Sequence, residues 1–411
     1  MRGRLPPALR MREFALVWTS TLANGLASQM LAVAIGWQVY AIHQNPLDLG
    51  LVGLAEFVPL PLLALPAGQL VDRASRRRIT AISLVFDLAI AGLLVGITLA
   101  GAQKLWPFLA IGVGAGAAQA IGVPATRALT PEIVPTELLQ GAVALRSVAG
   151  QIGVVVGPAL GGIVFAVEPV AVYASAVGLF GVALVAILLL PPRAAPATST
   201  GPPDWDSLVA GVRFVLRTRM LLGAILLDLF AVLLGDAIAL APVFARTILD
   251  VGPVGLGLLR SAPSAGALLA GLMISRRPLR RPAGPTLLVV VGVFGAATIV
   301  FGLSRSLPLS LAALAVTGFA DMISMNIRAT TVAIVTPLAL QGRVSAVEWV
   351  FISASNELGA FESGAVASLI GTVRAVVLGG SLMIAIAFSW RRLFPELARM
   401  GPLDELRPQP L

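Results

Sequence analysis

Three carboxylates stand inside long apolar stretches of the sequence. Asp228 and Asp236 lie in the run 220–245, and Asp321 lies near the middle of 307–328. An ionised side chain is costly inside a membrane, so such residues usually serve a function or pair with a partner. A carboxylate there can exchange a proton, because a low-dielectric environment favours its neutral form. We therefore predict that these three residues contact protons or substrate. An interhelical hydrogen bond is the alternative, above all for Asp228.

Two further polar groups in apolar runs are predicted to line a polar interior. The run 344–369 contains three glutamates. On a helix with about 100° per residue, Glu348 and Glu362 fall within about 40° of each other, whereas Glu357 faces the opposite way. One face can therefore meet the arginine-rich cytoplasmic turns that would form a latch, and the other a polar interior, where we place Glu357. We assign the same role to Gln29, in the run 14–40.

Three more charged residues are candidates for ion pairs. Glu56 and Arg260 occupy matching places about two hundred residues apart. They could form an outer gate, either together or through a pair between Arg260 and Asp236, and a purely structural ion pair is the alternative. Arg146, near the inner end of the run 141–166, is placed to contact Asp72 or another acid in a neighbouring loop.

The elements that must position these residues are membrane-spanning helices. The chain has 411 residues, of which 57% are hydrophobic and 12% charged, a composition typical of membrane proteins. A helix needs about 20 apolar residues to cross a bilayer. The sequence predicts twelve such spans, at 14–40, 50–71, 79–101, 106–126, 141–166, 169–190, 220–245, 254–274, 285–304, 307–328, 344–369 and 373–393.

The basic residues predict the orientation of these spans. They gather in the two tails, in the turns after the second and eighth spans and in 193–219, whereas the opposite loops hold only Lys104, Arg246, Arg305 and Arg374. Lys and Arg are retained on the cytoplasmic side of a membrane. We therefore predict a protein of the inner membrane with both termini in the cytoplasm. The net charge of +9 thus reflects topology and contact with anionic lipid. Nucleic-acid binding is not expected, since the charge is split among loops.

The composition also disfavours several kinds of chemistry. With no cysteine and a single histidine, His43, the chain offers no thiolate and no zinc or haem site. The only lysine, Lys104, is followed by Leu105, so no phosphate-binding loop is present. We expect no catalytic residue, metal or cofactor, which disfavours an enzyme, and no repeated filter element that would indicate a channel.

The chain consists of two similar halves, as two stretches about 203 residues apart indicate. In each, a glycine closes an apolar run and arginines follow, as expected where a helix meets the cytoplasm in a tight turn. The first stretch contains Gly68, Asp72, Arg73, Arg76 and Arg77, and the second contains Gly271, Ser275, Arg276 and Arg280. The aspartate is present in the first copy and replaced by serine in the second.

Twelve spans in two halves, with this turn between the second and third, resemble the major facilitator superfamily. The resemblance covers the whole chain and implies an all-α membrane protein of two pseudo-symmetric six-helix bundles. It implies a central cavity lined by spans one, four, seven and ten, which places Asp228, Asp236 and Asp321 beside that cavity. It also implies that Asp72 and the arginines of both turns form a cytoplasmic latch that holds the outward-open state.

A second motif resembles the antiporter motif of drug and metabolite exporters in this superfamily. It lies in the fifth span and consists of Gly153, Gly157, Pro158, Gly161 and Gly162. Small residues spaced by four let two helices approach closely, so ordinary helix packing is the alternative. The segments Trp37–Tyr40 and Gly342–Val347 are similar to the enterobactin-exporter-like subgroup.

These observations predict an N-terminal bundle at 1–190, a cytoplasmic linker with an amphipathic helix at 191–219, a C-terminal bundle at 220–394 and a cytoplasmic tail at 395–411. The expected function is secondary active export of an amphipathic small molecule, such as a drug, siderophore or metabolite, by proton-coupled alternating access. The alternative is a lipid or lysolipid transporter on the same fold. Expected partners are the substrate, protons and membrane lipids, and we expect a monomer.

Overall fold

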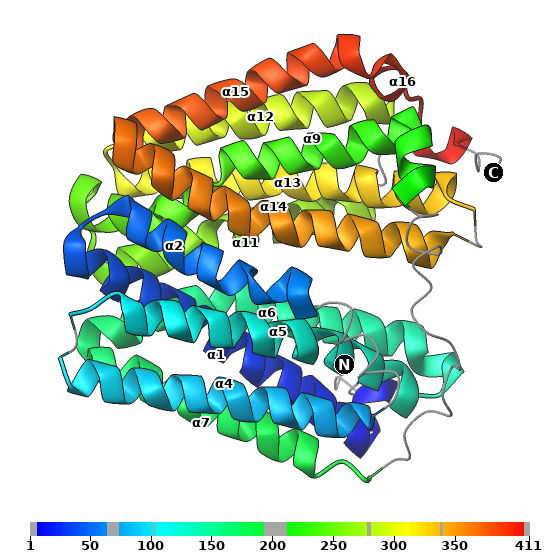
Figure 1. Cartoon of the computed structure of the whole chain (residues 1–411). Coiled ribbons are helices and arrows are strands. Elements are labelled where there is room, and N and C mark those ends of the chain that lie inside the picture. Colours follow the sequence, from blue (N-terminus) through cyan, green and yellow to red (C-terminus); the bar gives the residue numbers. More distant parts are fainter. Residues whose placement is uncertain are drawn as a thin grey trace. The chain divides into compact units, whose positions relative to one another are not determined.

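The computed structural model describes residues 6–63, 74–101, 103–192, 212–277, 281–337 and 340–406, and in these ranges the chain is helical without strands (Figure 1). Eleven helices of the described part are long and apolar enough to cross a membrane. The remaining predicted span, the eleventh at 344–369, corresponds to helix α14 (Gln341–Ile370), which contains three glutamates. A helix therefore stands at each of the twelve predicted spans.

Among the described residues, six principal helices lie in the first half of the sequence and six in the second half. The first six are α1 (Arg12–His43), α2 (Pro46–Phe57), α4 (Arg76–Leu99), α5 (Trp106–Ile133), α6 (Thr136–Val167) and α7 (Pro169–Leu188). The second six are α9 (Arg219–Gly235), α11 (Gly252–Arg276), α12 (Ala283–Leu303), α13 (Leu307–Val335), α14 and α15 (Thr372–Leu393). The turns before α2 and α11 show the repeat in the backbone, since Gln44 and Asp250 both adopt left-handed φ angles, of 52° and 51°.

The helices form two compact units. Unit 1 comprises Met1–Gln44, Ala55–Pro203 and Val251–Ser261, and unit 2 comprises Asn45–Leu54, Asp204–Asp250 and Ala262–Leu411. In unit 1, α1 packs against α6 and α7, and α4 packs against α5 and α7. In unit 2, α12 packs against α13 and α15, and α9 packs against α14. Each unit thus includes the first residues of a helix, α2 or α11, that comes from the opposite half of the sequence.

Each unit buries its own large side chains and leaves apolar ones on its outer face. Tyr173 and Phe180 of α7 are fully buried in unit 1, as is Leu227 of α9 in unit 2. Large side chains such as Leu369, 83% exposed, and Phe388, 66% exposed, lie on the surface. Exposed apolar side chains such as these suit contact with lipid chains.

The seventh predicted span is not one continuous α-helix. Helix α9 ends at Gly235, and Asp236 has φ −74° and ψ 65°, which is outside the helical region. A 3-10 helix, η2 (Ala237–Leu240), then a short α10 (Ala241–Val243) and a π-helix, η3 (Phe244–Ile248), complete the span. Pro242 contributes to this irregularity, because it lacks the N–H that a continuous helix would use.

The predicted linker at 191–219 falls mostly on 193–211, outside the described residues, and its last part is helical at 212–217. The predicted tail starts with a short helix, α16 (Pro395–Ala398), and a 3-10 turn, η4 (Leu403–Glu405). The sequence-based division into bundles, linker and tail stays a prediction.

Candidate functional site: a buried charge cluster in unit 2

A buried arginine on α13 holds the charge cluster of unit 2 together. The Nη1 of Arg328 lies 2.6 Å from the Oδ1 of Asp228 on α9, and only 8% and 11% of the two side chains are exposed. The Nη2 of Arg328 lies 4.0 Å from the Oδ1 of Asp321, whose side chain is 51% exposed. The guanidinium therefore lies close to one buried carboxylate and farther from a more accessible one.

Helix geometry explains why α13 can present this arrangement. Asp321 and Arg328 are seven residues apart, about two turns, and so lie on the same face. Ser324 lies between them and accepts a hydrogen bond of 3.3 Å from the Nε of Arg328. Long side chains on a helix point toward its N-terminus, which directs the guanidinium back along α13 toward Ser324 and Asp321. A regular α-helix is therefore sufficient to bring Asp321, Ser324 and Arg328 together.

Two small cavities flank the ion pair, both inside unit 2. One has about 230 Å³ of empty space and is lined by Asp228, Arg328, Glu348 of α14 and apolar side chains that include Phe351. The other has about 340 Å³ and is lined by Asp228, Asp321 and Ser324, with apolar side chains of α9, α12 and α15. Asp228 lines both cavities, so the Asp228–Arg328 pair separates one acid, Glu348, from another, Asp321.

The charges of the cluster do not balance. Glu348 interacts electrostatically with both Arg328 and Asp228, and Asp321 interacts with the same two residues. One guanidinium thus faces three carboxyl groups. A buried pair loses about 3–5 kcal/mol when one partner is removed, so Arg328 holds Asp228 in place. The remaining carboxyl groups can be neutralised by protons or by a cationic group.

The other acids of unit 2 are distributed along α9 and α14. Asp236 stands at the break after α9 and is close enough to Glu362 for the two charges to interact. Glu348 and Glu362, which share a helix face, thus both lie near acids of the α9 segment. Glu357 faces elsewhere, because a Cβ on Gly53 of α2 would lie 3.6 Å from its Oε2. The cavity roles of Asp236 and Glu357 stay predictions.

The predicted gate residues Glu56 and Arg260 both belong to unit 1. They interact electrostatically, so Arg260 is a charged neighbour of Glu56. Arg146 lies close enough to Arg127 of α5 for the two charges to interact, and Asp72, one of its predicted contacts, lies outside the described residues. The gating roles of these residues stay predictions.

Part of the predicted latch can be located. Gly68, Asp72, Arg73 and Arg280 lie outside the described residues. Arg76 forms an ion pair of 3.4 Å with Glu132 on α5, and Arg77 donates hydrogen bonds of 3.2 and 2.6 Å to the carbonyls of Ile187 and Leu188 at the end of α7. Arg276 is the last residue of α11 and is exposed. Arginines at helix C-termini are favourable, and the latch function stays a prediction.

The glycine motif of α6 allows close packing on α1 within unit 1. A Cβ on Gly153 would lie 2.8 Å from the backbone of Gly25, and one on Gly157 would lie 2.6 Å from the Cβ of Gln29. Gln29 therefore packs its stem against this motif. Gly162 packs instead against Pro253 and Gly257, in the part of α11 that belongs to the same unit. Pro158 is buried within α6. The antiporter role stays a prediction beside the packing role.

Changing Gly161 to alanine is expected to lower the free energy of unfolding by about 1–3 kcal/mol, the range for overpacking. The new Cβ would lie 2.8 Å from the Cα of Met30, and backbone cannot move aside as a side chain can. Gly150 on the same helix is the control, because a Cβ there meets nothing within 4 Å. Gly150→Ala should be neutral or stabilising by up to about 1 kcal/mol. Equal thermal unfolding of both variants in detergent would contradict the packing role.

Several residues of the charge cluster were not predicted from the sequence. No role was predicted for Arg328 or for Ser324. The signal was present: an arginine in a membrane helix requires a partner, and Asp321 lies two turns away on the same face. Asp228 was predicted as a site residue because it is a carboxylate inside an apolar run. The sequence does not show that Arg328 is its partner.

Solved structures support the fold. The nucleoside transporter NupG superposes with a TM-score of 0.75 at 13% sequence identity, over 93% of this chain and 99% of that one. A bacterial homologue of the human lysosomal transporter Spinster superposes with a TM-score of 0.74 at 16% identity, over 97% of this chain and 100% of that one. These likenesses show the fold, and the match of residues 4–410 to a family model of the major facilitator superfamily shows the class: a multi-pass membrane transporter and not an enzyme.

Sequence comparison narrows this class. A model of the family described as transmembrane secretion effector matches residues 4–410, and the chain belongs to this family. The enterobactin exporter EntS of Citrobacter koseri is 27% identical over 398 residues, which covers 96% of this chain and 93% of the relative. EntS of Shigella boydii has the same identity and coverage. The predicted resemblance to the enterobactin-exporter-like subgroup is confirmed.

Proposed function

We propose that this protein is a secondary active exporter of the inner membrane that moves an amphipathic small molecule out of the cytoplasm in exchange for protons. The observation that carries the proposal is the charge cluster in which Arg328 joins Asp228 and Asp321. A membrane bundle seldom retains such a cluster for stability alone, because apolar side chains would fill the same space at lower desolvation cost. A role in transport accounts for its presence.

The uneven environment of the two aspartates supports proton exchange. Asp228 is 11% exposed and lies 2.6 Å from Arg328. Asp321 lies 4.0 Å from the same guanidinium and is half-exposed. It can therefore gain or lose a proton with little rearrangement of the buried pair. We assign the coupling proton to Asp321, while Asp228 and Arg328 keep the site charged and ordered.

The direction of transport is inferred from the relatives. The proteins similar over nearly the whole chain are named enterobactin exporters, and the matching family is described by secretion. We therefore infer that this protein also exports its substrate. The arginine distribution predicts that both of its termini lie in the cytoplasm. The substrate class is an amphipathic small molecule, of which a catecholate siderophore is one example.

Inverted membrane vesicles test this function. With an acidified interior, vesicles that contain the protein should take up ethidium or enterobactin as probe substrates, and a protonophore should stop the uptake. Vesicles without the protein give the background. Uptake that is indifferent to the proton gradient would contradict proton coupling. Translocation of a fluorescent lysolipid in place of both probes would favour the lipid transporter.

A further inference from the structure

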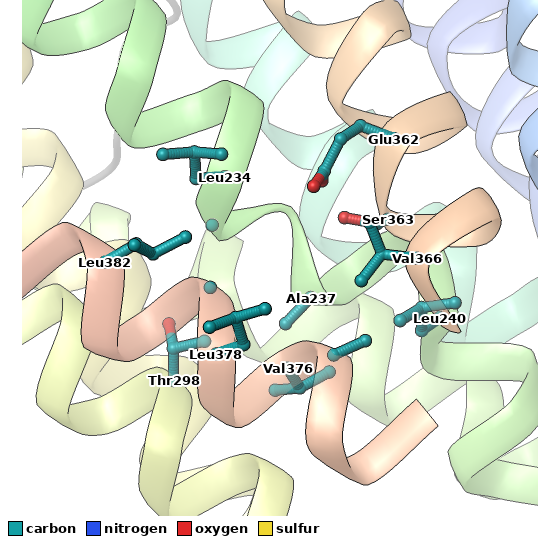
Figure 2. A pocket seen from close by; sticks show the side chains of 13 residues that line it. Leu234, Ala237, Leu240, Thr298, Glu362, Ser363, Val366, Val376, Leu378 and Leu382 are labelled. Carbon is teal, nitrogen blue, oxygen red and sulfur yellow. The ribbon is translucent and has the colours of Figure 1, made fainter. Parts of the chain in front are cut away.

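Three cavities of unit 2 are unfavourable for a negatively charged group. The pocket beside the break after α9 is lined mostly by apolar side chains, with Glu362 as its carboxylate (Figure 2). The two cavities that flank the Asp228–Arg328 pair each contain more carboxylates than guanidinium groups. Like charges repel. An amphipathic solute with a negative charge, such as a catecholate, therefore needs a positive site elsewhere in the chain.

Unit 1 has an arginine at the place that Arg328 occupies in unit 2. Arg127 and Arg328 each stand thirteen residues before a Gln-Gly pair. An acid on the same helix face is present only in the second half: Asp321 stands seven residues before Arg328, whereas Ala120 stands seven residues before Arg127. Arg127 therefore lacks the carboxylate that its counterpart has on its own helix.

A second arginine, Arg146 of α6, approaches Arg127 of α5. The two helices are joined by Val134 and Pro135, and so short a turn makes them antiparallel neighbours. At 1.5 Å per residue, the Cα atoms of Arg127 and Arg146 lie about 10 Å and about 16 Å from this turn. Long side chains point toward the N-terminus of their own helix, so Arg127 extends away from the turn and Arg146 toward it. The two guanidinium groups thus reach similar levels, and their charges interact.

Arg146 lies on a face of α6 that is buried in unit 1. Ala142 and Ala149, four residues before it and three residues after it, are fully buried, and Gly153 further along this face packs against α1. Residues at these spacings share a helix face. The Nε of Arg146 is inaccessible and has no hydrogen-bond partner among the described residues. A buried N–H without an acceptor is unfavourable, so this side chain calls for an acceptor that the described residues do not supply.

The acids near the turn do not face these arginines. Glu132 of α5 lies about 140° around the helix from Arg127, and it forms an ion pair with Arg76. Glu137 of α6 lies about 180° around its helix from Arg146. Within the described residues neither arginine forms an ion pair, and the charge that acts on Arg146 is that of Arg127. Two positive charges in proximity without a carboxylate between them favour the binding of an anion.

We propose that Arg127 and Arg146 form a binding site in unit 1 for an anionic oxygen group, a carboxylate or phenolate, of the exported solute. Two guanidinium groups can hold the oxygen atoms of such a group through charge-assisted hydrogen bonds. This proposal rests on the proposed export function and names the charge of the exported molecule. Unit 1 would recognise that charge, while the acids of unit 2 carry the coupling proton.

Binding of ¹⁴C-labelled salicylate to the purified full-length protein tests the site, in phosphatidylcholine nanodiscs at constant pH and ionic strength. Salicylamide is the matched neutral probe, because an amide replaces the carboxylate on the same ring. Wild type should bind salicylate saturably and at least about tenfold more tightly than salicylamide, since a charge-assisted contact is worth more than a neutral one. Arg127→Gln and Arg146→Gln should each weaken salicylate binding by at least about tenfold and leave salicylamide binding unchanged.

A matched variant and the midpoint of thermal unfolding control for general effects. Arg12→Gln removes an exposed arginine at the start of α1 and should bind salicylate as wild type does. Salicylate should raise the unfolding midpoint of wild type and raise it less in Arg127→Gln and Arg146→Gln. Without salicylate both variants should be at least as stable as wild type, because one of two repelling charges has been removed.

Four results would overturn the proposal. The first is salicylate binding to wild type that is no tighter than salicylamide binding. The second is full affinity for salicylate in folded Arg127→Gln and Arg146→Gln. The third is stabilisation by added phosphatidylglycerol that both variants lose, without a response to salicylate, which would assign the arginines to a lipid phosphate. The fourth is a loss of stability in Arg146→Gln that Asp72→Asn restores, which would show an ion pair within the chain.

Failure of this proposal and failure of the proposed function give different results. Salicylate binding is measured at one pH without a gradient, so a loss of proton-driven uptake in vesicles would leave it unchanged. An absence of salicylate binding would leave proton-driven export of a neutral or cationic molecule unaffected.

Discussion

Replacing Arg328 with glutamine is expected to abolish transport and to lower the free energy of unfolding by about 3–5 kcal/mol, because an uncompensated Asp228 would remain buried. Arg328 and Asp228 are both almost inaccessible and lie 2.6 Å apart. Glutamine carries no charge and cannot provide the two-nitrogen fork of a guanidinium. Thermal unfolding in detergent and probe uptake by inverted vesicles measure the two effects.

Two further variants distinguish the ion pair from a general loss of charge. Arg276→Gln removes an exposed arginine at the end of α11 and should change stability by less than about 0.5 kcal/mol. The double variant Asp228→Asn with Arg328→Gln should recover much of the lost stability, because no unpaired charge remains buried, while transport stays absent. Full transport by Arg328→Gln would contradict the role of this arginine.

Replacing Asp321 with asparagine is expected to uncouple transport while the protein stays folded. Asp321 is half-exposed and lies 4.0 Å from Arg328, so its charge contributes less to stability than that of Asp228. One proton moving down a potential of 100 mV supplies about 2.3 kcal/mol, which sustains a solute ratio of roughly fiftyfold. In the variant this ratio should fall to about one, while exchange of labelled for unlabelled substrate continues.

The control for this variant is Asp404→Asn, which changes an exposed carboxylate in the C-terminal segment. Its accumulation ratio should equal that of wild type. If Asp321→Asn accumulates the probe to the wild-type ratio, the coupling proton is carried by another group, and the assignment to Asp321 is wrong.

The fold could be predicted almost completely from the sequence, and the physical reason is the bilayer. Apolar runs of sufficient length must be helical in lipid, and the twelve predicted runs correspond to helices in the structure. The break at Asp236 was not predicted, because apolar composition continues through it and the weak signals, Gly235 and Pro242, are common in membrane helices.

The site was predicted only in part. Asp228 and Asp321 were predicted because a charged side chain is costly in a membrane, an argument that considers one residue at a time. Their connection through Arg328 depends on how α9 packs beside α13, and an argument about single residues cannot predict helix packing.

The most direct test of the central claim is to count the protons released when substrate binds to the purified protein in a weakly buffered solution. If Asp321 exchanges a proton for substrate, adding enterobactin or ethidium at the pH where the site is protonated should release about one proton per chain from wild type. Asp321→Asn should bind the same probe and release none. Equal proton release by wild type and a folded, substrate-binding Asp321→Asn variant would contradict the account.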